Sequence, residues 1–110
     1  MHRVRVERGE RAAVLVAEGE LDAYSAPELA ECFAEVTPTS AIVVDLAGVS
    51  FMDSTALGLL VRALRELEEG AVAIRVVLPE TPARRIFEIT TLDQVLPVAA
   101  SRDEALAELD

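Results

Sequence analysis

Three consecutive residues, Asp53-Ser54-Thr55, carry side chains that accept hydrogen bonds, and they lie between two apolar patterns. The run from Ala41 to Leu46 before them is mostly apolar. After them, apolar residues recur at the spacing of one helix face: Leu57, Leu60, Val61, Leu64 and Leu67. Such residues cap the free backbone N–H groups of a helix's first turn. A hydroxyl there is also presented at the positive end of the helix dipole, where an added phosphate is well placed.

A serine nucleophile would need a base beside it, and the sequence offers none. The nucleophile elbow of hydrolases has glycines two residues on either side of its serine, where this chain has Met52 and Ala56. His2 is the only histidine, and the chain has no lysine. We therefore expect a protein that is not an enzyme and has no catalytic residue. A fluorophosphonate probe that failed to label Ser54 would remove the hydrolase alternative.

The other residues with reactive side chains favour structural interpretations. Asp45 and Asp53 do not make a response-regulator type of acidic pocket, which also needs a lysine, so we interpret Asp45 as the end of a strand and Asp53 as a helix cap. Cys32 is the only cysteine, which excludes an intrachain disulfide and a multi-cysteine metal site. His2 has no second ligand nearby in sequence. We expect no metal and no cofactor.

Length, composition and charge restrict the class of protein. The chain has 110 residues, of which 52% are hydrophobic, and this predicts one globular domain spanning residues 1–110. No apolar run is long enough for a membrane span or a signal peptide, so we expect a cytoplasmic protein. The net charge of −10 is spread along the chain. This charge disfavours nucleic acid and anionic membranes as partners and favours a protein that is basic at the contact.

The first half of the chain predicts strands alternating with a helix. An alternating segment at 3–7 suggests an edge strand, and the apolar run at 13–17 suggests a strand buried on both faces and ending at Gly19. Ser25-Ala26-Pro27-Glu28 has the pattern of a capping box, so a helix should begin there and end before Pro38. Its expected apolar face comprises Leu29, Cys32, Phe33 and Val36. A central strand at 41–46 should then end in a turn at Ala47-Gly48.

The second half continues this alternation. A helix over 54–68 should stop at Gly70 and be followed by a buried strand over 72–78. We expect a short helix over 82–89 with Ile86 and Ile89 on one side, a weak edge strand over 94–99, and a last helix capped by Ser101 that carries Ala105, Leu106 and Leu109. The fold class is therefore α/β, with a mixed, mostly parallel central sheet and about four helices. Four short helices would leave one sheet face thinly covered or free for contact.

Two segments resemble the STAS domain of bacterial anti-sigma factor antagonists, also called anti-anti-sigma factors. They are Gly19-Glu20-Leu21-Asp22 and the stretch from Asp45-Leu46 through Phe51-Met52-Asp53-Ser54-Thr55-Ala56-Leu57-Gly58. In that family the serine after the aspartate is phosphorylated by the anti-sigma factor, which is itself a serine kinase. The resemblance implies that Ser54 is the phosphorylation site and that Asp22 is the loop acid beside it. It also implies partner contacts at Asp22, Asp53, Ser54, Thr55 and Ala56.

The resemblance implies a regulatory binding protein in a partner-switching pathway. Unphosphorylated, it would bind the kinase and free a sigma factor from it, and a phosphatase acting on the phosphorylated form would restore the unphosphorylated one. ATP and magnesium would belong to the kinase. The family usually has glycine where this chain has Ala56, which bears on the choice of partner. The alternative is a STAS subunit of a lipid-transport complex or a stress-signalling scaffold, without a phosphorylation cycle. A neighbouring gene for a small histidine-kinase-like ATPase would favour the first function, and one for a transporter permease the second.

Overall fold

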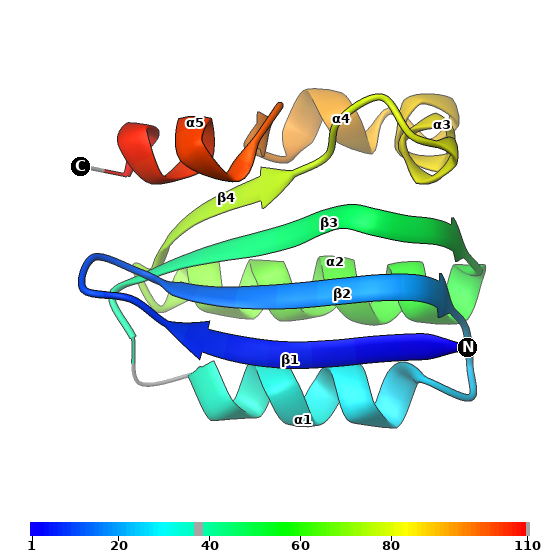
Figure 1. Ribbon diagram of the computed structural model, residues 1–110, viewed down its shortest axis with the longest axis horizontal. Helices are drawn as coiled ribbons and strands as arrows, with labels where there is room; N and C mark the ends of the chain where they lie inside the picture. The colour runs from blue at the N-terminus through cyan, green and yellow to red at the C-terminus, as the bar shows by residue number, and fades with distance from the viewer. Residues whose placement is uncertain (37–38, 110) are drawn as a thin grey trace.

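The computed structural model describes residues 1–36 and 39–109, whose alternating sequence patterns form a sheet flanked by helices (Figure 1). In chain order the elements are β1 (His2–Arg8), β2 (Ala13–Leu21), α1 (Ala26–Val36), β3 (Ala41–Met52), α2 (Ser54–Glu69), β4 (Ala73–Val77), α3 (Pro82–Ile89), α4 (Leu92–Val95), β5 (Val98–Ala99) and α5 (Arg102–Glu108). The predicted α/β class is confirmed.

The sheet is mixed and mostly parallel, as the sequence predicted. Its strand order is β1-β2-β3-β4-β5, with β1 antiparallel to β2 and the remaining neighbours parallel. The alternating segment near the N-terminus is indeed an edge strand, and β3 is central. No helix within residues 1–36 and 39–109 is long and apolar enough to cross a bilayer.

Successive side chains along the strands point to opposite faces of the sheet and form two apolar cores. Leu15 of β2 and Val44 of β3 lie in the larger core, which α1, α2 and α3 complete. Their neighbours Val14 and Val43 lie in the smaller core, where Ala105 of α5 packs. β2 is therefore buried on both faces, as predicted. The four apolar residues expected to face the core from α1 are all buried, and burial raises the pKa of the Cys32 thiol.

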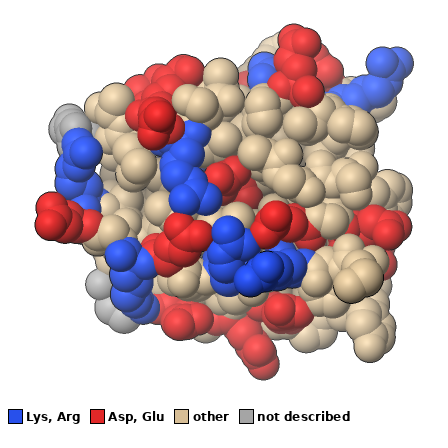
Figure 2. All heavy atoms as spheres, in the orientation of Figure 1, with Lys and Arg blue, Asp and Glu red and all other residues tan. Residues whose placement is uncertain are grey.

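The face that carries the smaller core is covered by α5 and by charged side chains (Figure 2). Arg102 of α5 donates to Asp45 on β3 at 2.9 and 3.1 Å and to Glu7 on β1 at 3.0 Å. Arg5 in turn donates to Glu7 at 3.1 Å and to Glu18 at 2.5 Å. Ion pairs thus neutralise the part of the sheet that the helices leave thinly covered.

The sequence predicted that β2 ends at Gly19, but the strand continues to Leu21. Gly19 has a φ of +83°, and a Cβ atom there would lie 2.2 Å from the carbonyl oxygen of Met1. Glycine alone tolerates this conformation and this close approach without strain, so the strand passes through a position that resembles a stop in sequence.

β3 does not turn at Ala47-Gly48 but continues to Met52. Val16 pairs with Asp45 whereas Glu18 pairs with Gly48, so the strand accommodates an extra residue as a bulge. Asp45 is therefore inside the strand, and the prediction that it ends a strand was wrong. Its buried carboxylate also accepts a hydrogen bond from the Ala47 N–H at 3.0 Å.

The capping box predicted at the start of α1 is not formed. The Glu28 carboxylate lies 2.6 Å from Nε2 of His2 and does not cap the Ser25 N–H. That N–H donates to the Asp22 carboxylate at 3.0 Å. Pro38, the predicted end of this helix, lies outside the described residues. Ser101 does cap α5, since its hydroxyl accepts from the Glu104 N–H at 3.1 Å.

The C-terminal third differs from the prediction in three places. The described residues hold five helices instead of four, because α4 and the two-residue β5 replace the strand expected at 94–99. In α3, Phe87 is buried and Ile89 is 72% exposed, so the predicted Ile86 and Ile89 face was wrong for Ile89. Gly70 caps α2 as expected, but the residue with positive φ is Ala71, at 63°.

We predict that Leu60→Ala lowers the free energy of unfolding by about 2–5 kcal/mol, because truncation of a buried leucine leaves a cavity. Leu60 is fully buried in the larger core, between the sheet and α2. Arg62→Ala is the matched control on the exposed side of the same helix and should cost little. Urea denaturation measures both, and equal losses would show that the core face of α2 is misassigned.

Candidate functional site

The predicted site residues gather where two parallel strands end. Leu21 of β2 pairs with Met52 of β3, so the loop after β2 and the start of α2 emerge side by side, at the right of Figure 1. The Asp53 N–H donates to the carbonyl of Leu21 at 3.0 Å, which continues the sheet pairing past Met52. The β2–α1 loop, with Asp22, is thereby held against the start of α2.

Asp53 joins this loop to α2 through both of its carboxylate oxygens. Oδ1 accepts from the Ala56 N–H at 2.9 Å, which makes Asp53 the N-cap of the helix. Oδ2 accepts from the Ala23 N–H at 3.1 Å. Asp53 caps a helix as the sequence predicted. Its second bond, to a residue thirty positions earlier, has no signal in the sequence.

Asp22 organises the loop after β2. Its Oδ1 accepts hydrogen bonds from the Tyr24 N–H and the Ser25 N–H, both at 3.0 Å, and from the Ser25 hydroxyl at 3.3 Å. The Ser25 N–H bond is the main reason that the pKa of Asp22 is lowered. No described residue hydrogen-bonds to Oδ2 of Asp22. The residue is thus an ionised acid with one oxygen available to a partner.

Ser54 and Thr55 occupy the first two positions of α2, and both are exposed. Neither hydroxyl hydrogen-bonds to a described residue. The backbone N–H groups of both residues also lack an acceptor within the described part of the chain. The site therefore presents a hydroxyl on Ser54 beside two free donors at the positive end of the helix dipole.

Ala56 differs from the other predicted contact residues because its side chain is fully buried. It packs in the larger core, and its N–H is the group that Asp53 caps. The Ala56 methyl group is not on the described surface. The surface of the candidate site consequently consists of Asp22, Asp53, Ser54 and Thr55.

Two exposed aromatic residues on the strand and loop that form this site were not identified from the sequence. Tyr24 is 87% exposed in the loop after β2, and Phe51 is 47% exposed at the end of β3. Tyrosine and other large aromatic side chains are enriched at protein interfaces. The available signal was the position of each residue. Tyr24 lies in a loop and Phe51 lies beside the buried Met52, so neither aromatic side chain has a core to enter.

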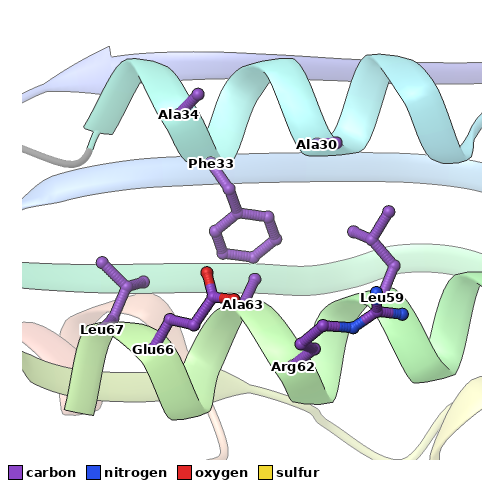
Figure 3. Close-up of a pocket in the computed structure, with 8 residues that line it drawn as sticks. All are labelled: Ala30, Phe33, Ala34, Leu59, Arg62, Ala63, Glu66 and Leu67. Atoms are coloured by element: carbon purple, nitrogen blue, oxygen red, sulfur yellow. The ribbon is translucent and has the colours of Figure 1, made fainter. Parts of the chain in front are cut away.

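Two grooves run along α2. One, of about 470 Å³, is lined by Ser54, Leu57, Gly58, Val61, Arg62, Arg65 and Leu92. The other, of about 390 Å³, lies between α1 and α2, with Phe33 projecting from α1 toward α2 and Leu59 from α2 toward α1 (Figure 3). Arg62 lines both grooves. Only the first contains a predicted site residue, Ser54.

His2, a titratable residue near this site, lies beside the loop that carries Asp22. His2 contacts Glu28 at 2.6 Å, and its ring packs edge-on to Tyr24 with the centroids 6.3 Å apart. Its imidazole is therefore engaged by Glu28 and Tyr24, next to Asp22. Within residues 1–36 and 39–109, no three His, Cys, Asp or Glu side chains are placed to hold a metal ion.

We predict that Asp53→Ala lowers the free energy of unfolding by about 0.5–2 kcal/mol, the usual effect of losing an N-cap, because Ala56 N–H and Ala23 N–H both lose their acceptor. Asp53→Asn keeps one acceptor oxygen and should lose less. Asp103→Ala, an exposed acid in the first turn of α5, is the control and should change stability by less than either. Urea denaturation gives the ranking, and an Asp53→Ala variant as stable as Asp103→Ala would contradict it.

Comparison with known proteins places this geometry in a family. The STAS domain family model matches residues 3–105. An anti-sigma-B factor antagonist of Staphylococcus aureus is 39% identical over 82 residues, which cover 73% of this chain and 76% of that protein.

Solved structures agree with this placement. The crystal structure of an anti-sigma factor antagonist from Mycobacterium paratuberculosis superposes with a TM-score of 0.89 and 29% identity, covering 99% of this chain and 94% of the other. The phosphorylated form of SpoIIAA, a Bacillus cell fate determinant, shares the fold with a TM-score of 0.76 at 23% identity, over 98% of this chain and all of that one. From the family match over residues 3–105 and the 39% identity to a curated relative, the chain belongs to the STAS domain family.

Proposed function

We propose that this chain is an anti-sigma factor antagonist: it binds an anti-sigma serine kinase while Ser54 is unphosphorylated, and phosphorylation of Ser54 ends that binding. Binding of the kinase would free the sigma factor that the kinase otherwise holds. A phosphatase acting on the phosphorylated chain would complete the cycle. ATP and magnesium belong to the kinase, so this chain needs no cofactor of its own.

The exposed, unbonded hydroxyl of Ser54 at the start of α2 is the observation that carries this proposal. A kinase needs an acceptor hydroxyl that it can reach, and Ser54 provides one on a backbone fixed by Asp53. Asp22 lies in the loop that Asp53 holds against this helix, where its free oxygen can accept a hydrogen bond from the kinase. The relatives named as anti-sigma factor antagonists support the same role.

Charge and energy favour a switch that acts at the interface. A phosphoserine adds about −1.5 to −2 charges, and the helix dipole favours that charge by roughly 0.3–1 kcal/mol at an exposed site. Repulsion from Asp53 offsets part of this gain. Either effect is small beside a folding free energy of about 5–15 kcal/mol. A docked partner that must desolvate the new charge, or place like charge against it, loses several kcal/mol, which is a hundredfold or more in affinity.

We predict that the kinase phosphorylates Ser54 and not Thr55. Both residues are exposed, but Ser54 lines the groove along α2 and Thr55 does not. Thr55 is also β-branched, which restricts the rotation of its side chain. Asp53 is the N-cap of α2, so the preference for Ser54 rests on the groove and the family motif. Incubation with candidate kinases and ATP, followed by intact mass and peptide mapping, tests it. Ser54→Ala should abolish the added mass and Thr55→Ala should keep it.

We predict that Ser54→Asp loses kinase binding by a hundredfold or more while its circular dichroism spectrum and melting point stay near those of the wild type. Ser54→Ala is the control, and it should bind the kinase and resist release by ATP. Binding of Ser54→Asp at wild-type affinity would contradict the mechanism. If no candidate kinase modifies or binds the wild-type chain, the STAS-subunit function without phosphorylation replaces this proposal.

A further inference from the structure

The groove that opens at Ser54 continues along α2 beyond the residues of the family motif. Leu57 and Val61 of α2 and Leu92 of α4 supply its apolar lining. It has a volume of about 470 Å³. The groove is therefore large enough for side chains of a partner that already contacts Ser54.

Arg62 and Arg65 make one side of this groove basic. The chain has a net charge of −10, and Arg5, Arg75 and Arg102 are all paired with carboxylates. Among residues 1–36 and 39–109, no carboxylate lies within ion-pair distance of Arg62 or Arg65. Two unpaired cations next to an apolar lining, on a strongly acidic protein, favour a partner that carries acids there.

Arg62 lines both this groove and the neighbouring groove between α1 and α2. Figure 3 shows its side chain running back along α2 to a position beside Leu59, one turn nearer the N-terminus. Long helical side chains lean that way, over the preceding turn. The guanidinium therefore points toward the Ser54 end of α2. The acids of this helix, Glu66, Glu68 and Glu69, all follow Arg65 in sequence, and Glu66 lies one turn after Arg62.

Gly58 is the second, independent observation. A Cβ atom at Gly58 would meet nothing within 4 Å, so no internal packing requires glycine there. It sits inside α2 without a positive φ, where glycine is the least favourable residue after proline. Glycine at an exposed position allows a second backbone to approach closely. The fold alone gives no reason for glycine at this position, whereas a chain lying in the groove does.

We propose that this groove binds an acidic segment of the anti-sigma kinase, with carboxylates of that segment on Arg62 and Arg65 and its backbone passing over Gly58. The inference rests on the proposed function and adds the chemistry of the partner to it. On the other side of Ser54, Glu20 and Asp22 are acidic. The contact surface consequently has a basic half along α2 and an acidic half at the end of β2, and this polarity fixes the orientation of the kinase.

The test uses the kinase that phosphorylates the wild-type chain at Ser54, held with a non-hydrolysable ATP analogue so that binding is measured without turnover. The double variant Arg62→Glu/Arg65→Glu should bind it at least tenfold more weakly by calorimetry, and the difference should shrink as salt is raised. Arg3→Glu is the control, with one charge reversed instead of two. It makes the same type of charge reversal on β1, in register with Glu18 and away from α2, and should bind within about twofold of wild type.

Gly58→Gln separates binding from folding. Its side chain enters open space, so the thermal midpoint should stay level or rise by roughly 3–6 °C, because glycine is replaced by a good helix former. Kinase binding should nevertheless fall at least tenfold. A variant that is as stable as the wild type and binds equally well would overturn the proposed passage over Gly58.

The outcomes distinguish this inference from the proposed function. If Ser54→Asp loses binding while Arg62→Glu/Arg65→Glu keeps wild-type affinity, the antagonist function stands and the acidic-segment inference is wrong. A loss in the double variant that does not depend on salt would also overturn it, because ion pairs at an exposed rim are screened. Failure of every kinase to modify or bind the wild-type chain would overturn both.

Discussion

The parallel pairing of β2 with β3 is the constraint on which the candidate site depends. It brings the ends of two strands that are separated by a whole helix to the same edge of the sheet, with Leu21 opposite Met52. Asp53 then stands where the sheet ends, and its backbone continues the pairing while its side chain serves both Ala56 and Ala23. A shift of one residue in this register would turn the apolar side chains of β3 to the wrong face and would move Asp53 away from the loop.

Arg102 on one side of the sheet and Arg62 and Arg65 on the other differ in their partners. Over β1 to β3, Arg102 reaches the buried carboxylate of Asp45 and the half-buried one of Glu7. Burial opposes the charge of Arg102, but these two partners outweigh it and raise its pKa. On the side of α2, Arg62 and Arg65 have no such partners among the described residues. The contrast matters because paired charges are already neutralised within the chain, whereas unpaired ones on an acidic protein are free to select a partner.

The sequence predicted those features that depend on local patterns. The helical spacing of Leu60 and Leu64, the capping residue Asp53 and the apolar runs of the strands were enough for the fold class and the position of Ser54. It did not predict features that depend on contacts between distant residues. The bulge at Ala47 and the φ of Gly19 resemble turns in sequence because both patterns use small residues. That Arg62 has no carboxylate partner among the described residues is visible only once the positions of nearby carboxylates are known.

The site combines a fixed backbone with free side chains, and this combination suits a reversible switch. Asp53 and Asp22 hold the loop and the helix start through their carboxylates, so a partner has little main-chain disorder to remove when it docks. Association otherwise loses affinity to the ordering of loops and side chains. The Ser54 hydroxyl contributes nothing to this framework, since it bonds to no described residue. In the proposed cycle a phosphate would therefore be added to it, or removed from it, while the hydrogen bonds that shape the proposed docking surface stay in place.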